Sequence, residues 1–424
     1  MRTTALALCA AFASLLGCPR VGGPLATSSD RVLPLRLPEP AYEEIFPYYA
    51  ELCAVSRFDR LGVEHGGAAG HAVLYLKGAC REEGAPFPTL RMCPEVVNDL
   101  QDPRHGVGVS VNAAYKNVNW VAYPGRRLFF SGNLSRGQTL TQEHFDATVR
   151  SIVDLGVLRG VDVDEKRLVF THPEAPLEER IAESLMGTDV AIRFARSLWC
   201  ASVPLKRAQM ERAVGHLNEL NRGYASGAAS YDYSLYYDNC VRALHDSLAA
   251  AGVWEPVKER SRFLGQVFQM KVPANELGQL SERITRFPID DFDAVRKDGA
   301  ASASLGAFGW LPTRHGALLK SAPVHRPNEL YDTSLQMFVV EGPGERATGR
   351  FRELATDARF TQLEPNLLYY EERYRQILAN PQGAGWLPRS AEDEALRARY
   401  RAYVAAQLEE VRDLIGRLPG YDSR

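Results

Sequence analysis

The hydrophobic pattern of this chain changes period partway along its length. In the first part, short apolar runs are bounded by glycine and proline, a pattern that is typical of β-strands. The expected strands are residues 71–77, 106–112, and the arms 119–123 and 127–131 of a hairpin that turns at Pro124-Gly125. This part of the chain is therefore predicted to form an antiparallel sheet.

In the second part, apolar residues recur every three to four positions, which predicts helices. The expected helices are residues 142–155, 176–198, 205–222, 240–252, 276–285, 363–378 and 391–418, and a further helix at 40–58 precedes the sheet. The small-residue segment 299–306 predicts a loop or linker, and residues 334–340 predict one more strand. The predicted fold class is thus α+β, an antiparallel sheet with helices and a largely helical C-terminal extension.

The N-terminus has the features of an export signal. A basic start, Met1-Arg2, precedes an apolar run at residues 5–16 that is too short to span a membrane stably. The sequence Leu15-Leu16-Gly17-Cys18 that ends it resembles the lipobox of bacterial lipoproteins. This resemblance implies that Cys18 is diacylated and becomes the first residue of the mature chain. The alternative is an ordinary secretory signal cleaved nearby, and both interpretations export the protein.

The composition is that of a folded body. Hydrophobic residues make up 45%, charged residues 24%, and the formal net charge is −2, which argues against disorder and against nucleic-acid binding. No later segment is long and apolar enough to cross a bilayer, so we expect a lipid-anchored protein that faces the periplasm of a bacterial cell envelope. Pro19 follows the anchor where an aspartate would favour the inner membrane of enteric bacteria, so an outer-membrane location stays open.

The cysteine count predicts a free thiol. Outside the signal and the proposed anchor, five cysteines remain: Cys53, Cys80, Cys93, Cys200 and Cys240. An odd number in an oxidising compartment leaves at least one unpaired. Cys80 and Cys93 bracket a loop that contains proline and glycine, which favours a local pair and leaves Cys53 for Cys200. The connectivity is open, and parity alone does not single out Cys240.

The stretch Asp238-Asn239-Cys240 is the strongest candidate for chemistry. It leads into residues 240–252, whose apolar spacing predicts a helix, and Asp238 and Asn239 both favour the N-cap position. Cys240 should therefore lie in the first turn, where unpaired backbone N–H groups and the helix dipole favour the thiolate. The alternative is that Cys240 is a buried structural cysteine or half of a disulfide.

A histidine at a strand start is the candidate base. His71 follows a glycine- and alanine-rich loop and opens the predicted strand 71–77, so small neighbours would let a substrate approach it. The alternative is a structural histidine at a strand end, whose hydrogen-bonding groups have partners but no role in catalysis. His65 in the same loop is a weaker candidate. Five other histidines are expected to be surface or structural residues: His144, His172, His216, His315 and His325. His245 is an unlikely base, because it lies five residues beyond Cys240 on the same predicted helix and points about 140° away from it.

The order of these parts resembles the circularly permuted papain-like superfamily, which includes lecithin–retinol acyltransferase-like and NlpC-type proteins. In that superfamily a histidine at a strand start precedes a cysteine that often follows asparagine at a helix start. Gly70-His71-Ala72 and Asn239-Cys240 match this pattern, and the aromatic lead-in 231–237 is similar to that of uncharacterised bacterial membrane-associated lipoproteins. The resemblance covers residues 64–252, and the segment 142–222 is longer than the acyltransferase-like members carry.

The resemblance implies a domain organisation and a set of roles. Residues 1–17 would be a lipoprotein signal peptide, 18–39 a tether, 40–262 a permuted papain-like domain with a helical insert, and 263–424 an α+β extension. Cys240 would be the nucleophile and His71 its base, with Ser110 or Asn112 orienting the imidazole. Asn239 and Tyr237 would contribute to binding, and the Cys240 backbone N–H to an oxyanion site.

These expectations describe an exported thiol hydrolase or acyltransferase that acts on an amide or ester bond in the cell envelope. Its substrate would be an envelope peptide, protein or lipid. The alternative is a non-catalytic envelope lipoprotein that uses the same fold for binding or assembly. The sequence has no HExxH motif, no paired Cys/His ligand spacing, no P-loop and no GxGxxG loop, so no metal and no cofactor are expected.

Overall fold

The computed structural model describes most of the chain after residue 39. The described residues are 40–55, 59–60, 63–64, 70–168, 172, 174–229, 231, 233, 239–257, 273–331, 351, 353–380 and 390–418. Several predictions lie outside them: the signal, Cys18, the tether, His65, Tyr237, Asp238 and the strand at 334–340. Within the described part, no helix has the length and hydropathy that a bilayer crossing requires.

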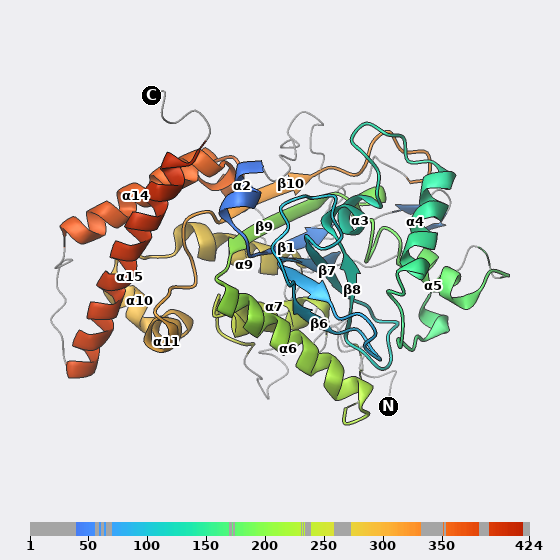
Figure 1. Cartoon of the computed structure of the whole chain (residues 1–424), viewed down its shortest axis with the longest axis horizontal. Coiled ribbons are helices and arrows are strands. Elements are labelled where there is room, and N and C mark those ends of the chain that lie inside the picture. Colours follow the sequence, from blue (N-terminus) through green and yellow to red (C-terminus); the bar gives the residue numbers. More distant parts are fainter. Residues whose placement is uncertain are drawn as a thin grey trace, which may run out of the picture.

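The fold is mixed α+β and centres on a six-stranded sheet whose order is β10-β9-β1-β4-β7-β8 (Figure 1). Every neighbouring pair in this sheet is antiparallel. In chain order the strands are β1 (Tyr49–Val55), β4 (His71–Lys77), β7 (Gly106–Val111), β8 (Trp120–Pro124), β9 (Leu198–Pro204) and β10 (Leu318–Ala322). All residues of β1 and β7 are buried, which makes these strands part of the core.

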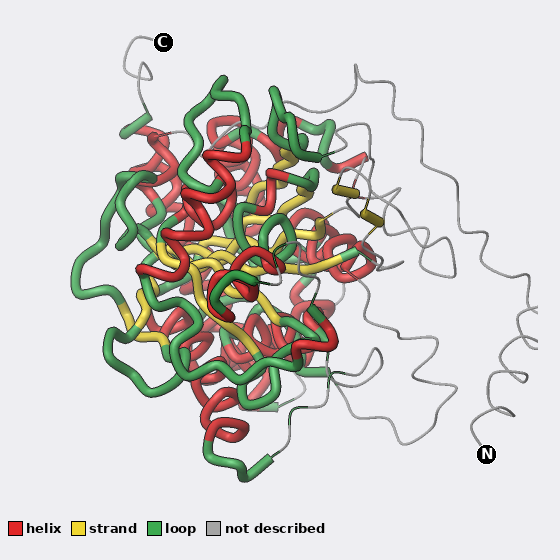
Figure 2. The backbone as a smooth tube through the Cα atoms, turned by 90° about the vertical axis from the view of Figure 1, so that its right-hand side faces the viewer, coloured by secondary structure: helices red, strands yellow, loops and turns green. Residues whose placement is uncertain are grey.

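Helices lie on both sides of the sheet, whose strands run through the middle of the molecule (Figure 2). Helix α7 (Cys240–Ala250) packs against β4, β7 and α6 (Arg207–Ala225). Helix α9 (Pro273–Arg286) packs against β1 and β9. Helix α3 (Arg126–Ser131) crosses β7 and β8 so closely that a Cβ at Gly108 would lie 2.0 Å from the Phe129 ring. Glycine is therefore required at this crossing.

The predicted helices at 142–155, 205–222, 276–285, 363–378 and 391–418 are confirmed. They are α4 (Gln142–Asp154), α6, α9, α14 (Leu363–Ala379) and α15 (Ala391–Gly416). The smaller elements are α2 (Pro40–Ile45), β2 (Asp59–Arg60), β3 (Val63–Glu64), β5 (Ala79–Arg81), β6 (Leu90–Met92), α5 (Leu177–Leu185), α10 (Phe292–Lys297), α11 (Gly299–Phe308) and α13 (Ala358–Thr361). The chain beyond residue 262 contributes β10 to the edge of the main sheet.

Two predictions in the first part are wrong. The expected helix at 40–58 ends at Ile45, and the chain then forms β1, because a strand that is buried on both faces lacks the alternation that distinguishes it from a helix. The expected hairpin at 119–131 has only its first arm: after β8 the chain turns at Gly125, with φ at 76°, and forms α3. The apolar pair Phe129 and Phe130 is buried by a helix rather than by a strand.

Two predictions in the later part are also wrong. The expected helix at 176–198 stops at Leu185, and the chain continues through a short 3-10 turn, Ile192–Phe194, into β9. The segment 299–306 is not a loop but belongs to α11, which Asp298 caps by accepting a hydrogen bond from the Ala301 N–H. The small residues of this segment do not show the apolar spacing that indicates a helix, although the helix begins after a strong N-cap residue.

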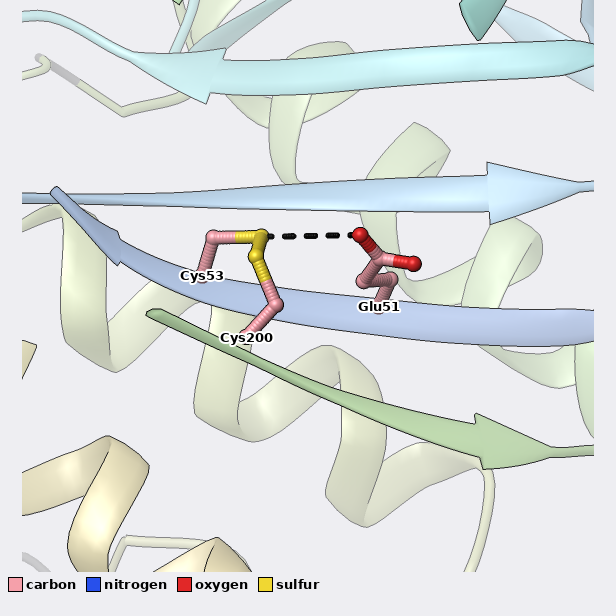
Figure 3. Close-up of side chains that lie close together, drawn as sticks. All are labelled: Glu51, Cys53 and Cys200. Atoms are coloured by element: carbon pink, nitrogen blue, oxygen red, sulfur yellow. Dashed lines mark hydrogen bonds between the residues drawn. A yellow bond between two sulfur atoms is a disulfide. The ribbon is translucent and has the colours of Figure 1, made fainter. Parts of the chain in front are cut away.

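The structure joins Cys53 to Cys200 and Cys80 to Cys93 and leaves Cys240 as a free, buried thiol. These are the two pairings that the sequence analysis favoured. Cys53 and Cys200 lie opposite each other on β1 and β9, with the Glu51 carboxylate 3.9 Å from the Cys53 sulfur (Figure 3). A disulfide sulfur carries no proton and is not a thiolate ligand, so this cluster is a packing contact and not a metal site.

Candidate active site

The first turn of α7 is built around Asn239 and Cys240. The Asn239 side chain caps the helix by accepting a hydrogen bond of 2.9 Å from the Arg242 N–H. Cys240 is therefore the first helical residue, and it is only 4% exposed. This is the local geometry that the sequence indicated. The structure gives Asn239 a capping role, and Tyr237 lies outside the described residues.

The start of β4 brings His71 to this helix end. Gly70 has φ at 73°, and a Cβ there would lie 2.7 Å from the Val55 carbonyl oxygen, so only glycine makes this entry into the strand. Because α7 packs along β4, the Cys240 side chain hydrogen-bonds the His71 imidazole and accepts a further hydrogen bond from the Ala72 N–H. The structure thus brings together Cys240 and His71, which lie far apart in the sequence.

A carboxylate completes the cluster. His71 Nε2 lies 2.9 Å from Ser110 Oγ on β7, and Ser110 donates a short hydrogen bond to Asp189 Oδ1. The same imidazole nitrogen is 3.5 Å from Asp189 Oδ1. Since Ser110 donates its proton to the carboxylate, its oxygen accepts from His71 Nε2–H, which leaves Nδ1 as the ring nitrogen available to the thiol.

The Asp189 carboxylate is itself held on its other oxygen. Asn112 Nδ2 and Thr188 Oγ1 each donate to Asp189 Oδ2 at 2.8 Å. Ser110 therefore contacts His71 directly, whereas Asn112 acts one step away through Asp189. The sequence analysis missed Asp189, because it lies in a segment that was expected to be helical. The turn chemistry of Gly187-Thr188-Asp189 is the signal that could have revealed it.

The site favours a charged thiolate and a charged imidazole. Burial lowers the pKa of His71, but the Cys240 charge and the hydrogen bond that the imidazole donates to Asp189 outweigh it and raise this pKa to about 9. Burial raises the pKa of Cys240, but the charge and hydrogen bond of His71 outweigh it and lower this pKa below its ordinary value. Asp189 is fully buried, yet its hydrogen bond with His71 keeps its pKa low and the carboxylate ionised.

One further side chain touches the sulfur. Tyr233 hydrogen-bonds Cys240, and burial together with the charge of Cys240 raises the pKa of its phenol, so the hydroxyl stays protonated and can donate. Tyr233 belongs to the aromatic lead-in that the sequence pointed to only as a whole. The site therefore presents a thiol from the start of α7, an imidazole from the start of β4 and a hydroxyl from β7. A carboxylate from the loop before β9 and a phenol from the segment before α7 complete it.

Three other histidines that the structure describes, His105, His245 and His315, lie outside this cluster. His245 hydrogen-bonds the Glu276 carboxylate and the Glu255 carbonyl, at 2.8 Å for the latter, and stacks on Trp254 at 4.2 Å between ring centroids. His315 is completely buried, and burial lowers its pKa to about 3, so it is neutral. His105, which the sequence analysis did not consider, bridges Tyr75 and Glu43 within the core.

The chain has no recognised relatives among the proteins with which it was compared. No known protein family, no curated protein and no solved structure matches it.

Proposed function

We propose that this protein is a cysteine hydrolase or acyltransferase that acts on an amide or ester bond, with Cys240 as nucleophile and His71 as general acid and base. The observation that carries the proposal is the convergence of a free thiol, an imidazole and an ionised carboxylate at one point of the fold. This order of nucleophile, base and orienting group is the arrangement that activates cysteine nucleophiles.

Acylation starts from the thiolate–imidazolium pair. The Cys240 sulfur attacks the carbonyl carbon, a carbon–sulfur bond forms, and negative charge develops on the carbonyl oxygen. The Cys240 backbone N–H at the helix start and the hydroxyl of Tyr233, which hydrogen-bonds Cys240, would donate to that charge. His71 then gives its proton to the leaving nitrogen or oxygen as the carbon–nitrogen or carbon–oxygen bond breaks.

Deacylation reverses the role of His71. The neutral imidazole accepts a proton from a water molecule or from the hydroxyl or amine of an acceptor, whose heavy atom attacks the thioester carbon. The carbon–sulfur bond breaks and the Cys240 thiolate returns. Water makes the protein a hydrolase and an acceptor makes it a transferase. Ser110 and Asp189 hold the imidazole orientation through both steps.

We propose that the core is a circularly permuted papain-like fold. The support is that a histidine at the start of β4 precedes, in the sequence, a cysteine at the start of the helix that packs on β4 and β7. The orienting Ser110 comes from the neighbouring strand, as the resemblance implied. Two disulfides are typical of an oxidising compartment, and they support the proposal of an exported lipoprotein whose substrate is an envelope peptide, protein or lipid.

One observation favours the alternative of a non-catalytic binding protein. Cys240 is 4% exposed and the His71 side chain 15% exposed, so little of either side chain is accessible to a substrate. A protein that kept this cluster only to stabilise its core would show the same burial, but its thiol would not react with reagents in solution.

Labelling of the thiol separates the two functions. A thiol-reactive amide probe at neutral pH should label Cys240 of the native full-length protein far faster than the same thiol in denatured protein. The variant Cys240→Ala should lose the label, and His71→Ala should slow labelling to the rate of an ordinary thiol. Native Cys240 that reacts no faster than the denatured thiol would refute the enzymatic proposal.

A further inference from the structure

A cavity of about 430 Å³ lies between the C-terminal end of α9, the segment before α13 and one face of α14. None of its lining residues belongs to the candidate active site. Its lining includes the aromatic rings of Phe287, Phe360 and Tyr369 together with three arginines and three acidic residues. Sites for small molecules are typically cavities of about 300–1,000 Å³ that combine apolar walls with a few polar groups. This cavity has that size, and its charged groups indicate what it could hold.

Arg373 on α14 is the most buried cation of the lining, with 11% of its side chain exposed. Its Nε and Nη2 contact Asp290 Oδ1 at 2.8 and 2.7 Å, and Nη2 also donates to the Phe287 carbonyl at 3.0 Å. The guanidinium carbon lies 5.4 Å from the centre of the Tyr369 ring, one helical turn earlier. Within the described ranges Nη1 has no hydrogen-bond partner, and it is not fully buried. One edge of this guanidinium is therefore held in place while the other is available to a ligand.

Two further arginines of the lining repeat this arrangement. Arg359 binds the Asp357 carboxylate through Nε and Nη2, at 3.1 and 2.6 Å, and its guanidinium carbon lies 5.1 Å from the centre of the Tyr369 ring. Arg286 Nη2 donates to Glu353 Oε1 at 2.9 Å. Neither Nη1 has a partner among the residues that the structure describes. Three guanidinium groups thus line one cavity with unpaired N–H groups.

Two carboxylates of the same lining keep one oxygen unpaired. Asp290 contacts Arg373 through Oδ1, and Glu353 contacts Arg286 through Oε1. For Asp290 Oδ2 and Glu353 Oε2, the described part of the chain provides no donor. A purely anionic ligand would gain from the arginines but would be repelled by these carboxylates. A ligand that carries both an ammonium and a carboxylate can pair with both kinds of unpaired group.

We propose that this cavity binds a free amino acid or a short peptide. Its carboxylate binds the arginines, because a guanidinium matches the geometry of a carboxylate, and its ammonium binds Asp290 and Glu353. Its apolar side chain packs against Phe360 and Tyr369, whose rings lie 5.6 Å apart at 90° and form an apolar corner. Exposed ion pairs contribute little to stability, so the existing pairs can readjust around a ligand.

Calorimetric titration of the full-length protein with four small probes tests this. Phenylalanine and glycylphenylalanine carry both charged groups, phenylpropionate lacks the ammonium, and phenethylamine lacks the carboxylate. Each of the two truncated probes should bind about tenfold more weakly than phenylalanine, as the loss of a hydrogen bond to a charged group predicts. Tighter binding of phenylalanine than of glycylphenylalanine identifies an amino-acid site, and the reverse order identifies a peptide site.

Glu353→Gln and Arg359→Gln separate the two charges. Their side chains are 68% and 53% exposed, so both variants should fold. Glu353→Gln should weaken phenylalanine about tenfold and leave the affinity for phenylpropionate unchanged. Arg359→Gln should weaken phenylalanine and phenylpropionate alike and leave the affinity for phenethylamine unchanged.

Arg375→Gln is the matched control. Arg375 also lies on α14 and is 53% exposed, but it pairs with Glu371 and Glu372 and does not line the cavity, so the affinity for phenylalanine should stay at the wild-type value. An effect as large as that of Arg359→Gln would overturn the proposal, since it would show that the arginines act through net charge. Wild-type protein that binds neither phenylalanine nor glycylphenylalanine, or that binds phenylpropionate as tightly as phenylalanine, would overturn it as well. These outcomes do not depend on the reactivity of Cys240.

Discussion

Strand β4 has a buried polar cluster at each end, and the two clusters are built on different principles. At its C-terminal end, Lys77 is completely buried between the carboxylate of Glu43, at 2.9 Å, and Asn98 Oδ1, at 3.1 Å. His105 bonds the same carboxylate at 2.7 Å. On the neighbouring strand Glu51 receives hydrogen bonds from Arg126 and Ser202. We call these residues, Glu43, Glu51, Lys77, His105, Arg126 and Ser202, the structural cluster.

At its N-terminal end, β4 contributes His71 to the cluster of Cys240, Ser110 and Asp189. Under the proposed function, the charged partners here include the sulfur that attacks the substrate, and the imidazole transfers protons instead of only holding a contact. Removing one partner of a buried ion pair strongly lowers the stability of the fold, because it leaves the other charge buried without compensation. Substitutions in the cluster that contains Cys240 should instead leave the protein folded and lower its activity. The predictions below test that contrast.

The largest effect is expected at Asp189. Asp189→Asn keeps the shape of the side chain but reverses the polarity of the group that accepts from Ser110, so the imidazole loses its orienting partner. We expect hydrolysis of an activated ester to fall by about 10³-fold or more, by analogy with triad carboxylates in general. The measurement is kcat at neutral pH, with the denaturation midpoint as the control. A variant that unfolds but keeps its residual activity per folded molecule would contradict the assignment.

The structural cluster should show the opposite behaviour. Arg126→Met leaves the buried Glu51 carboxylate without its main partner, and breaking a buried pair in this way costs about 3–5 kcal/mol. Urea denaturation measures the loss in the free energy of unfolding. The rate of Cys240 alkylation in the folded fraction should stay near the wild-type value. If Arg126→Met were as stable as the wild type and its Cys240 were alkylated more slowly, the proposed difference between the two clusters would be wrong.

The pH dependence of stability should report the structural cluster. Burial raises the pKa of Glu43 and of Glu51, but hydrogen bonds and cations outweigh it and lower each pKa from 4.5 to about 2. A carboxylate with a lowered pKa in the folded state stabilises the protein above its unfolded pKa. That contribution is fully present above about pH 5 and disappears as the pH falls from there toward 2.

Denaturation followed between neutral pH and pH 2 tests this dependence. Glu51→Gln should have a lower free energy of unfolding at neutral pH and a weaker acid dependence than the wild type. An acid dependence as steep in Glu51→Gln as in the wild type would show that other groups are responsible.

The smallest effect is expected at Ser110. Ser110→Ala removes the hydroxyl between His71 and Asp189, but their side chains are already 3.5 Å apart, so a direct hydrogen bond can replace the lost one. We expect a loss of activity of about tenfold, the value of one hydrogen bond to a charged group. Asn112→Ala serves as the comparison, because the Asn112 side chain donates to Asp189 Oδ2, the oxygen that does not contact Ser110. A loss at Ser110 as large as at Asp189 would show that the hydroxyl is indispensable.

The sequence predicted the parts of the site that depend on local chemistry. Asn239 is a strong N-cap residue, and a glycine-rich turn followed by apolar residues marks the start of a strand, so Cys240 and His71 could be placed without a structure. Ser110 and Asn112 could be named because the resemblance implied an orienting group from the neighbouring strand. Asp189 could not, because its role depends on a loop that crosses the sheet edge, and no local pattern specifies where such a loop goes.

The errors in the fold have a similar origin. The sequence of β1 predicts a helix wrongly, because both faces of this strand are buried. Its apolar and polar residues therefore do not alternate, and the sequence pattern cannot distinguish a strand from a helix. The segment 176–198 contains a helix, a turn and the start of a strand, each too short for its pattern to be separated from the others. The alanine, serine and glycine content of α11 predicts a loop, although Asp298 before it marks a helix start.

The central claim is that the Cys240–His71 pair is a reactive thiolate–imidazolium pair, and the pH dependence of Cys240 alkylation tests it most directly. Alkylation of the native protein should reach a plateau below the ordinary thiol pKa of about 8.5 and change again near pH 9, where His71 loses its proton. In His71→Ala the plateau should disappear. A single rise near pH 8.5 in the wild type, unchanged in His71→Ala, would contradict the account.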